Sequence, residues 1–443
     1  MGVWQHSPTA RILALQNSSL RREYDRLLPG WTENDIAASP YAIYDYSLDS
    51  EFGNNTELSL LKTKLNNNGL NLILDFVPNH VAVNHRWITL HPEWFIPGSS
   101  KDVKAHPDWF FSPDGTSYLA HGRDPNFPPW TDTAQLNYYS ADLRQTLIQE
   151  LLKIAAVADG VRCDMAMLVI NNIFQMVWGD IAAEKMPQTE FWAQAISEVK
   201  KGFPDFIFIA EAYWGRELQL LEQGFNFIYD KALYDKLRYA SSTEILTYVV
   251  NKGADLARSV HFIENHDEPR ICSLFGKEKS KAAAVAMATM PGIRLFFDGQ
   301  LQGKCIHTPI QLVTEIAEPG DVDIAAFYKR LLYICGQPAF REGTWMPLNL
   351  TEASQNNNSY LNLMSWCWRN DRGLKVVIIN YSPDSSQGRL LLPPLPGEMS
   401  RLITRDELTD AVYESDADEV NSLGLYIALQ PWQSHILDVV LTI

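Results

Sequence analysis

The chain has 443 residues and a formal net charge of −16, with 46% hydrophobic and 20% charged residues. That length accommodates one barrel of about 250 residues together with smaller units, and the composition is that of an ordinary globular protein. The acidic charge argues against a nucleic-acid partner, because the phosphate backbone is bound by basic surfaces. No apolar run reaches about 18 residues, so we expect no membrane-spanning helix.

The cysteines indicate a reducing environment. They are widely scattered and contain no CxxC pair, so they predict neither a zinc site nor a disulfide framework. We therefore expect a cytoplasmic protein. Because GVW (residues 2–4) is typical of a core strand, we expect no signal peptide before the fold. The five cysteines are Cys163, Cys272, Cys305, Cys335 and Cys367.

Apolar runs and helix-like segments alternate over the first three quarters of the chain. Strands are predicted at residues 2–5, 71–76, 161–165, 206–212, 225–229, 260–265 and 293–297. Helices are predicted at residues 57–67, 142–158, 189–201, 242–252, 279–290 and 323–335. Strand–helix alternation indicates a parallel sheet, and this many units favour a closed (β/α)₈ barrel.

The alternation is interrupted once and then ends. Residues 80–137 are rich in Trp, Pro, Gly, Asp and His, which is typical of a functional loop domain inserted at the active-site face of a barrel. Near the C-terminus, short β-type runs separated by turn residues predict an antiparallel β-sandwich. We predict a catalytic barrel at 1–79 and 138–338, a loop domain at 80–137 and a β-sandwich at 339–443.

Four strand-like runs lead into acidic residues. Because the carboxyl ends of barrel strands meet on one face, we expect these side chains to converge there. A retaining glycosidase needs two such carboxyl groups about 5 Å apart, one as nucleophile and one as acid/base. The runs are LILDFVPNH (72–80), GVRCDMAML (160–168), FIAEAYW (208–214) and HFIENHD (261–267).

The neighbours of each carboxylate indicate its chemistry. Arg162 and Asp164 lie two positions apart on one strand face, so the guanidinium would keep Asp164 ionised, as a nucleophile requires. Glu211 ends an apolar run, and apolar surroundings favour the protonated carboxyl of a general acid. Asp267 follows His266, a pair able to hold a sugar hydroxyl.

These segments resemble the conserved regions of the α-amylase family of glycoside hydrolases (family 13). DFVPNH, GVRCD, AE after a hydrophobic strand, and ENHD are similar to its four regions in order, and QLN (135–137) and SPYAIYDY (39–46) are similar to two further motifs. The resemblance implies a (β/α)₈ barrel that hydrolyses α-linked glucose oligosaccharides or disaccharides through a glycosyl-enzyme. It implies Asp164 as nucleophile, Glu211 as general acid/base and Asp267 as transition-state stabiliser. The substrate-binding residues that it implies are Tyr41, Asp75, His80, Arg162 and His266.

Three positions depart from the family pattern. Where many members have small residues and then Lys-His after the nucleophile, this chain has Met165 to Leu168, which leaves the substrate open and leans toward an unusual acceptor side. Ser39 stands where many members have a histidine. The family's calcium site uses an asparagine like Asn79 and an aspartate whose place Gln135 takes, so we expect no metal and no other cofactor.

The segment GVWQHSP resembles the second barrel strand of the family. The first strand and its helix are therefore expected to be absent from this sequence, either because it begins inside a longer protein, which we favour, or because the protein is a shortened variant. A barrel without one strand would expose two edges.

Two alternatives to hydrolysis stay open. A transglycosidase or isomerase would use the same intermediate, and a non-catalytic relative would only bind carbohydrate. Further expectations are a buried thiol at Cys163, sugar platforms among Trp109, Trp130 and Trp214, and solvated loop histidines at His85, His91, His106 and His121.

Overall fold

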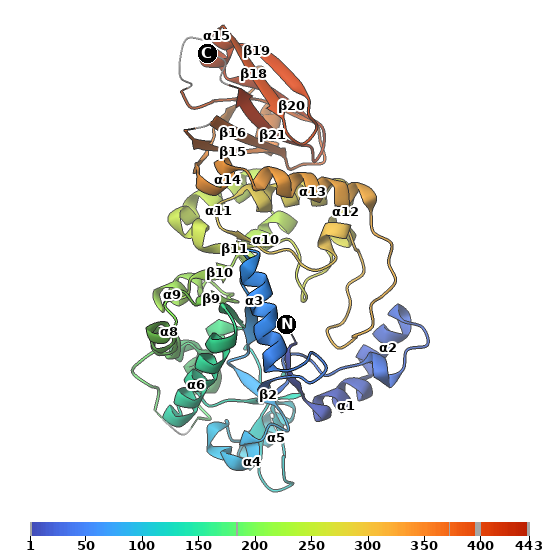
Figure 1. The fold of residues 1–443 in the computed structure, drawn as a ribbon, viewed down its shortest axis with the longest axis vertical. Helices are drawn as coiled ribbons and strands as arrows, with labels where there is room; N and C mark the ends of the chain where they lie inside the picture. Colours follow the sequence, from blue (N-terminus) through green and yellow to red (C-terminus); the bar gives the residue numbers. More distant parts are fainter. Residues whose placement is uncertain (1, 183–184, 372, 395–399, 441–443) are drawn as a thin grey trace. The chain divides into compact units, whose positions relative to one another are not determined.

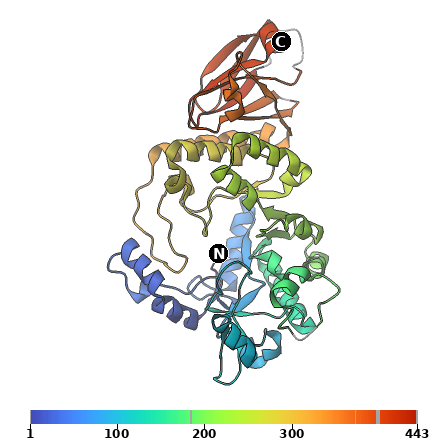
Figure 2. The same ribbon diagram turned by 180° about the vertical axis from the view of Figure 1, so that it is seen from behind.

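The computed structural model describes residues 2–182, 185–371, 373–394 and 400–440. The chain divides into two compact units, Met1–Tyr229 with Thr308–Ile316, and Asp230–His307 with Ala317–Ile443. Figures 1 and 2 show the ribbon from two sides. Among helices in the described ranges, none combines the length and apolar character needed to cross a membrane.

The first unit contains four neighbouring parallel strands in the order β3-β8-β9-β10. The strands alternate with helices, as the sequence predicts, and each strand falls inside its predicted range or within one residue of it. The strands are β3 (Ile73–Phe76), β8 (Gly160–Cys163), β9 (Ile207–Ala210) and β10 (Phe227–Tyr229). The intervening helices are α6 (Ala141–Val157), α7 (Asn171–Trp178), α8 (Phe191–Gly202) and α9 (Glu217–Glu222), with α3 (Asn55–Asn67) before β3.

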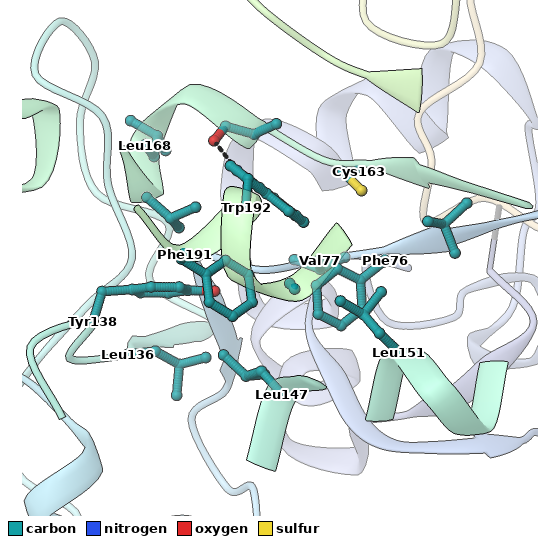
Figure 3. Packing of buried hydrophobic residues seen from close by; sticks show 14 of the residues in the cluster. Phe76, Val77, Leu136, Tyr138, Leu147, Leu151, Cys163, Leu168, Phe191 and Trp192 are labelled. Atoms are coloured by element: carbon teal, nitrogen blue, oxygen red, sulfur yellow. Dashed lines mark hydrogen bonds between the residues drawn. The ribbon is translucent and has the colours of Figure 1, made fainter. Parts of the chain in front are cut away.

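Helix α6 shows how the pattern produces the layer. Its N-cap, Ser140, accepts a hydrogen bond from the Leu143 amide, and leucines at i and i+4 bury one face. Figure 3 shows Leu147 and Leu151 from this face packed with Phe76, Tyr138, Phe191 and Trp192. The indole of Trp192 donates to the Ala166 carbonyl at 2.8 Å, so a large buried aromatic residue leaves no polar group unpaired.

The predicted first strand is present but has a different partner. It forms β1 (Trp4–His6), which pairs antiparallel with β2 (Ile43–Leu48). Trp4 still reaches the parallel sheet, because its indole donates to the Asp75 carbonyl at 2.7 Å. Between β1 and β2 lie two helices that the sequence reading missed, α1 (Pro8–Gln16) and α2 (Ser18–Leu27), followed by the turn η1 (Glu33–Asp35).

Residues 80–137 form short elements with little regular structure. The outer pair β4 (His80–Ala82) and β7 (Thr133–Gln135) closes the segment by antiparallel pairing. The inner elements are α4 (Trp87–Leu90), η2 (Pro92–Trp94), α5 (Ser100–Ala105), η3 (Pro107–Trp109), β5 (Phe110–Phe111) and β6 (Leu119–Ala120).

The second unit begins with further strand–helix alternation. Strands β11 (Ser259–His261) and β12 (Ile293–Arg294) are parallel neighbours. The helices are α10 (Lys231–Tyr239), α11 (Ser242–Lys252), α12 (Ile271–Thr289), α13 (Val322–Cys335) and α14 (Pro338–Glu342), with turns η5 (Gly253–Arg258) and η6 (Gln300–Gln302). Helix α12 is kinked at Gly276, whose φ of 68° suits glycine.

The C-terminal strands form the predicted antiparallel sandwich. One sheet has the order β13-β15-β16-β21-β18-β19 and the other β14-β17-β20. Strand residues alternate between two buried faces: Leu363 and Cys367 lie in the core between the sheets, whereas Trp366 and Trp368 lie in the core shared with the helices. Both indoles bond to Thr289 at the end of α12, and Figure 2 shows the helices beneath the strands.

The elements of this sandwich are short. They are β13 (Thr344–Pro347), β14 (Leu350–Thr351), η7 (Asn358–Asn362), β15 (Leu363–Asn370), β16 (Gly373–Asn380), β17 (Ser386–Leu390), β18 (Arg401–Asp406), β19 (Val412–Asp416), α15 (Ala417–Leu423), β20 (Leu425–Leu429) and β21 (Ser434–Val440).

The expectation that no cysteines pair is wrong. Cys272 and Cys305 form a disulfide; their Cα atoms are 5.1 Å apart, and the two residues are 33 positions apart in sequence. The fold of the second unit brings them together, and no CxxC spacing announces it.

Candidate active site

Three strand ends of the first unit place carboxylates side by side. The ladder pairs Asp75 of β3 with Arg162 of β8, and Arg162 with Ile209 of β9. One step further, the Asp164 amide donates to the Phe76 carbonyl at 2.9 Å, and the Glu211 amide donates to the Cys163 carbonyl at 3.0 Å. The register therefore fixes Asp75, Asp164 and Glu211 at one edge of the sheet, as the sequence predicts for strand ends.

Arg162 joins the three carboxylates. Its Nη1 lies 3.0 Å from Asp164 Oδ1 and 3.8 Å from Asp75 Oδ2, and its Nη2 lies 2.8 Å from Glu211 Oε2. All four side chains are buried. Burial opposes the charged guanidinium, but the surrounding negative groups, Glu211 foremost, outweigh it and raise the pKa of Arg162 above its ordinary value. The cluster is held by a permanent positive charge.

Two tyrosine rings lie against this guanidinium. The Arg162 Cζ atom is 5.6 Å from the ring centre of Tyr41 and 5.5 Å from that of Tyr229. Burial raises the pKa of Tyr41 well above its ordinary value and that of Tyr229 to about 12, so both hydroxyls stay neutral. Tyr41 was a sequence candidate. Tyr229 was missed, although it ends the predicted strand at 225–229 as the carboxylates end theirs.

Glu211 does not have the purely apolar surroundings that its preceding strand suggested. Besides Arg162, the Met165 amide donates to Oε2 at 2.8 Å and the Tyr213 hydroxyl donates to Oε1 at 2.6 Å. The apolar strand residues pack behind the carboxyl, while polar groups from the ends of β8 and β9 face it. Sequence periodicity shows the first environment and hides the second.

His80 is buried next to the loop segment. Its ring centre is 5.0 Å from that of Trp130, and burial lowers the pKa of His80 to about 3, so the imidazole is neutral. A hydrogen bond with the Tyr41 backbone opposes that shift and connects His80 to the tyrosine beside Arg162. The structure therefore brings together Tyr41, Asp75, His80, Arg162, Asp164 and Glu211 in the first unit.

His266 and Asp267 lie in the second unit. His266 Nε2 is 3.1 Å from Asp267 Oδ2, and the Asp267 side chain is 53% exposed. Asn265 accepts from the Asp267 amide at 2.9 Å, which fixes the loop after β11, and His307 Nε2 contacts the His266 carbonyl at 2.9 Å. The ENHD segment is therefore a turn fixed by hydrogen bonds, in which the Asp267 carboxylate is exposed.

The residues after Asp164 do not line an acceptor side. Met167 and Leu168 are in η4 (Ala166–Val169), which is wholly buried, and Figure 3 shows Leu168 in the hydrophobic core. The sequence interpretation of these two side chains is wrong, because the turn after β8 directs them inward. Met165 alone of this run is partly exposed, and it has a left-handed backbone with φ 42°.

Several loop aromatic residues and histidines differ from expectation. Both faces of the Trp109 ring are covered, so it is not a sugar platform. The His106 ring centre stacks 3.9 Å from the Trp109 ring centre, and Arg123 Cζ lies 3.6 Å from that ring centre. At these short distances the two groups must lie on opposite faces of the ring. His85 and His121 are buried rather than solvated. Cys163 is the buried thiol that its strand position predicts, and burial raises its pKa.

The residues at the family's calcium position do not suit the ion. Gln135 Nε2 lies 2.9 Å from the Asn79 carbonyl, 3.0 Å from Asn79 Oδ1 and 3.1 Å from the Leu136 carbonyl. A calcium ion would need these oxygens as ligands, but the side-chain NH₂ group of Gln135 already bonds to them. Within the described ranges, no group of three or more His, Cys, Asp or Glu side chains could hold a metal.

Comparisons with known proteins agree on one family. The family model for the α-amylase catalytic domain matches residues 31–345. α-Amylase MalA of Haloarcula japonica is 24% identical over 282 residues, covering 61% of this chain and 38% of that protein. The α-1,4-glucan:maltose-1-phosphate maltosyltransferase of Rhodospirillum rubrum is 28% identical over 307 residues, covering 66% of this chain and 37% of that protein.

A solved structure confirms the fold. The maltogenic α-amylase AmyB of Thermotoga neapolitana superposes with a TM-score of 0.69 at 19% identity, covering 91% of this chain and 86% of that one. The (β/α)₈ barrel with a C-terminal β domain, predicted above, is therefore the fold of this chain. The chain spans only 38%, 56% and 51% of the length of three curated relatives that it matches. With the catalytic-domain model matched over most of its length, the chain belongs to the α-amylase family of glycoside hydrolases.

Proposed function

We propose that the protein is a retaining α-glycoside hydrolase that acts on α-linked glucose oligosaccharides or disaccharides. Asp164 is the nucleophile, Glu211 the general acid/base and Asp267 the transition-state stabiliser. The observation that carries this proposal is the shared guanidinium: Asp164 and Glu211 contact neighbouring amino groups of Arg162 at 3.0 and 2.8 Å. Two carboxyl groups so close suit a retaining enzyme, in which they lie about 5 Å apart.

The reaction divides into two displacements. In the first, an Asp164 oxygen bonds to the anomeric carbon while the glycosidic C–O bond breaks and Glu211 gives its proton to the departing oxygen. In the second, Glu211 takes a proton from water, the water oxygen bonds to the same carbon, and the bond to Asp164 breaks. Two inversions return the α configuration.

The other residues bind and orient the sugar. Arg162 Nη1 contacts the Asp164 carboxyl at 3.0 Å and fixes its direction, and Asp75 lies 3.8 Å from the same nitrogen. Tyr41 presents a neutral aromatic ring on which a pyranose can stack. The neutral imidazole of His80 is bonded to the Tyr41 backbone and lies 3.3 Å from Asn79 Nδ2, so it orients the wall of the site beside Tyr41. The roles of His266 and Asp267 rest on the family resemblance, and the two side chains contact each other at 3.1 Å. Trp130, in ring contact with His80, is the loop aromatic residue that best fits a sugar platform.

Transfer of the glycosyl group to a sugar acceptor is the second candidate. Its support is the spread of the relatives, since an amylase and a maltosyltransferase match similar shares of this chain. Both outcomes use the Asp164 intermediate and differ only in whether water or a sugar hydroxyl attacks it. An α-amylase crystallised with acarbose is among the proteins of similar fold, which supports a carbohydrate as the ligand.

Anomer-resolved NMR of the products tests the proposal. Maltose, maltotriose and trehalose are incubated with the wild type and with Asp164→Asn. New α-anomer that is absent in the variant supports retaining hydrolysis, whereas longer or rearranged sugars support transfer. The β-anomer as first product would contradict the retaining mechanism. A cooperatively folded protein that binds these sugars without turnover would favour a binding protein over an enzyme.

A further inference from the structure

Both carboxyl oxygens of Glu211 are engaged, and two of the groups that engage them come from sterically strained turns. Met165 has φ 42° and Trp214 has φ 62°, in the left-handed region that large side chains avoid. Of the described non-glycine residues with positive φ, these are the two in the first unit. Met165 contacts Glu211 directly, and Trp214 follows Tyr213, which also contacts Glu211.

Strain of this kind persists only where the surrounding structure enforces it, and it is concentrated at functional sites. Met165 turns the chain immediately after Asp164 and directs its amide to Glu211 Oε2. Trp214 and Gly215 are left-handed in succession, and the Arg216 amide closes the turn onto the Tyr213 carbonyl at 3.2 Å. This turn fixes Tyr213 with its hydroxyl 2.6 Å from Glu211 Oε1.

The two oxygens of Glu211 therefore have different partners. Oε2 faces the Met165 N–H and the Arg162 guanidinium, which can only donate. A proton on Oε2 would meet two donors. Oε1 faces a hydroxyl, which donates to the ionised carboxylate and accepts from the protonated acid. The exchangeable proton belongs on Oε1, at Tyr213.

We propose that Tyr213 is a positioning residue for the acid/base step, which holds the transferable proton of Glu211 on Oε1. The proposal rests on the proposed role of Glu211. The other charged and titratable groups that face this carboxyl within the first unit act through Arg162: Asp75 and Asp164 share its guanidinium, and Tyr41 and Tyr229 lie against it. Of the three groups described in contact with the Glu211 carboxyl, only the Tyr213 hydroxyl can both donate a hydrogen bond to it and accept one from it.

The test compares Tyr213→Phe on two substrates. Maltotriose has a sugar leaving group that needs protonation, whereas α-glucosyl fluoride has a leaving group that departs without a proton. The expected result is a loss of about tenfold in kcat/KM for maltotriose, the scale of one hydrogen bond to a charged group, with the fluoride changed by less than about twofold.

Two controls make the comparison specific. Glu211→Gln should give the same pattern in larger measure. Tyr138→Phe removes another buried tyrosine hydroxyl, which donates to the Pro78 carbonyl at 2.7 Å, and should leave the ratio between the two substrates unchanged. Tyr213→Leu gives the same comparison should Tyr213→Phe not fold cooperatively.

The outcomes separate this inference from the proposed function. An equal loss on both substrates, or no loss on either, in a folded Tyr213→Phe protein would overturn the role of Tyr213 while leaving the glycosidase intact. A wild-type protein that turns over neither substrate would overturn the proposed function itself.

Discussion

Asn79 and Gln135 bond to each other through both ends of their amides. Gln135 Nε2 donates to Asn79 Oδ1 at 3.0 Å, and Asn79 Nδ2 donates to Gln135 Oε1 at 3.1 Å. Both side chains are almost fully buried. The pair joins the end of β3 to the end of the loop segment, 56 positions later in the chain. This neutral contact occupies the position at which the family resemblance implies a calcium ion.

Chelation should therefore leave the stability of the wild type unchanged. EDTA and calcium are added in separate thermal melts, and the expected Tm is the same in both. The variant Gln135→Asp removes the NH₂ group and supplies a carboxylate among the Asn79 and Leu136 oxygens. Calcium should raise its Tm by a few degrees, on the order expected for a ligand well above its Kd.

Gln135→Asn is the matched control, since it shortens the side chain equally without adding charge. It should show no response to calcium. A large drop in wild-type Tm on chelation would contradict the argument, because it would reveal a bound ion that the buried amide pair does not accommodate.

Replacing Asp164 by asparagine should abolish turnover and preserve the fold. The amide is nearly isosteric and its oxygen still accepts from Arg162 Nη1, but it cannot form the glycosyl-enzyme. We expect kcat to fall by more than about 10³-fold, with a cooperative thermal transition retained. Asp108→Asn, at η3 in the loop segment, is the control and should keep wild-type activity. Substantial activity in Asp164→Asn would show that another group is the nucleophile.

Arg162→Met should destabilise the protein as well as inactivate it. The change leaves Asp164 and Glu211 buried without their cation, which costs about 3–5 kcal/mol when one partner of a buried ionic cluster is removed. Urea unfolding at neutral pH measures this free energy.

Arg162→Lys separates charge from geometry. The lysine keeps a positive charge but lacks the planar fork that contacts two carboxylates at once. It should therefore recover part of the stability that Arg162→Met loses and little of the activity. If Arg162→Met is as stable as the wild type, the carboxylates are not held as the structure indicates.

The strands and the charged cluster could be predicted because both depend on local sequence. Apolar runs set β3, β8 and β9, and each carboxylate follows its run directly, so parallel pairing alone brings Asp75, Asp164 and Glu211 together. The backbone turns could not be predicted in the same way. The left-handed conformations at Met165 and Trp214 are unfavourable for those residues, so local preference argues against them.

Contacts between distant segments were also hidden in the sequence. Tyr229 follows Arg162 by 67 positions in the sequence, and no motif links the two residues. Cys272 meets Cys305 only because the second unit folds. The wrong expectation for Met167 and Leu168 has the same origin. Their position after the nucleophile in the family pattern predicted that they line the acceptor side, but the tertiary fold buries both side chains.

Buried neutral histidines should make the protein less stable in mild acid. Burial lowers the pKa of His85 to about 3, from an ordinary value of 6.5, and His80 behaves alike. In the unfolded chain these rings take up protons below pH 6.5, whereas in the folded chain they stay neutral until about pH 3. Their contribution to stability is therefore present above pH 6.5 and is lost as the pH falls from there toward 3.

The variant His85→Asn isolates this effect. In the wild type, His85 Nδ1 accepts a hydrogen bond from the Trp87 amide at 3.1 Å. The asparagine side-chain oxygen can accept the same bond, and asparagine does not titrate. Between pH 7 and pH 5, protonation of this ring in the unfolded chain lowers the wild-type free energy of unfolding by roughly 2 kcal/mol. The variant lacks this contribution, so its free energy of unfolding should fall by roughly 2 kcal/mol less than that of the wild type. Urea unfolding at both pH values measures the difference. His91→Asn, at a side chain 42% exposed, is the control and should follow the wild type. If His85→Asn loses as much stability as the wild type between these pH values, His85 is already protonated in the folded protein.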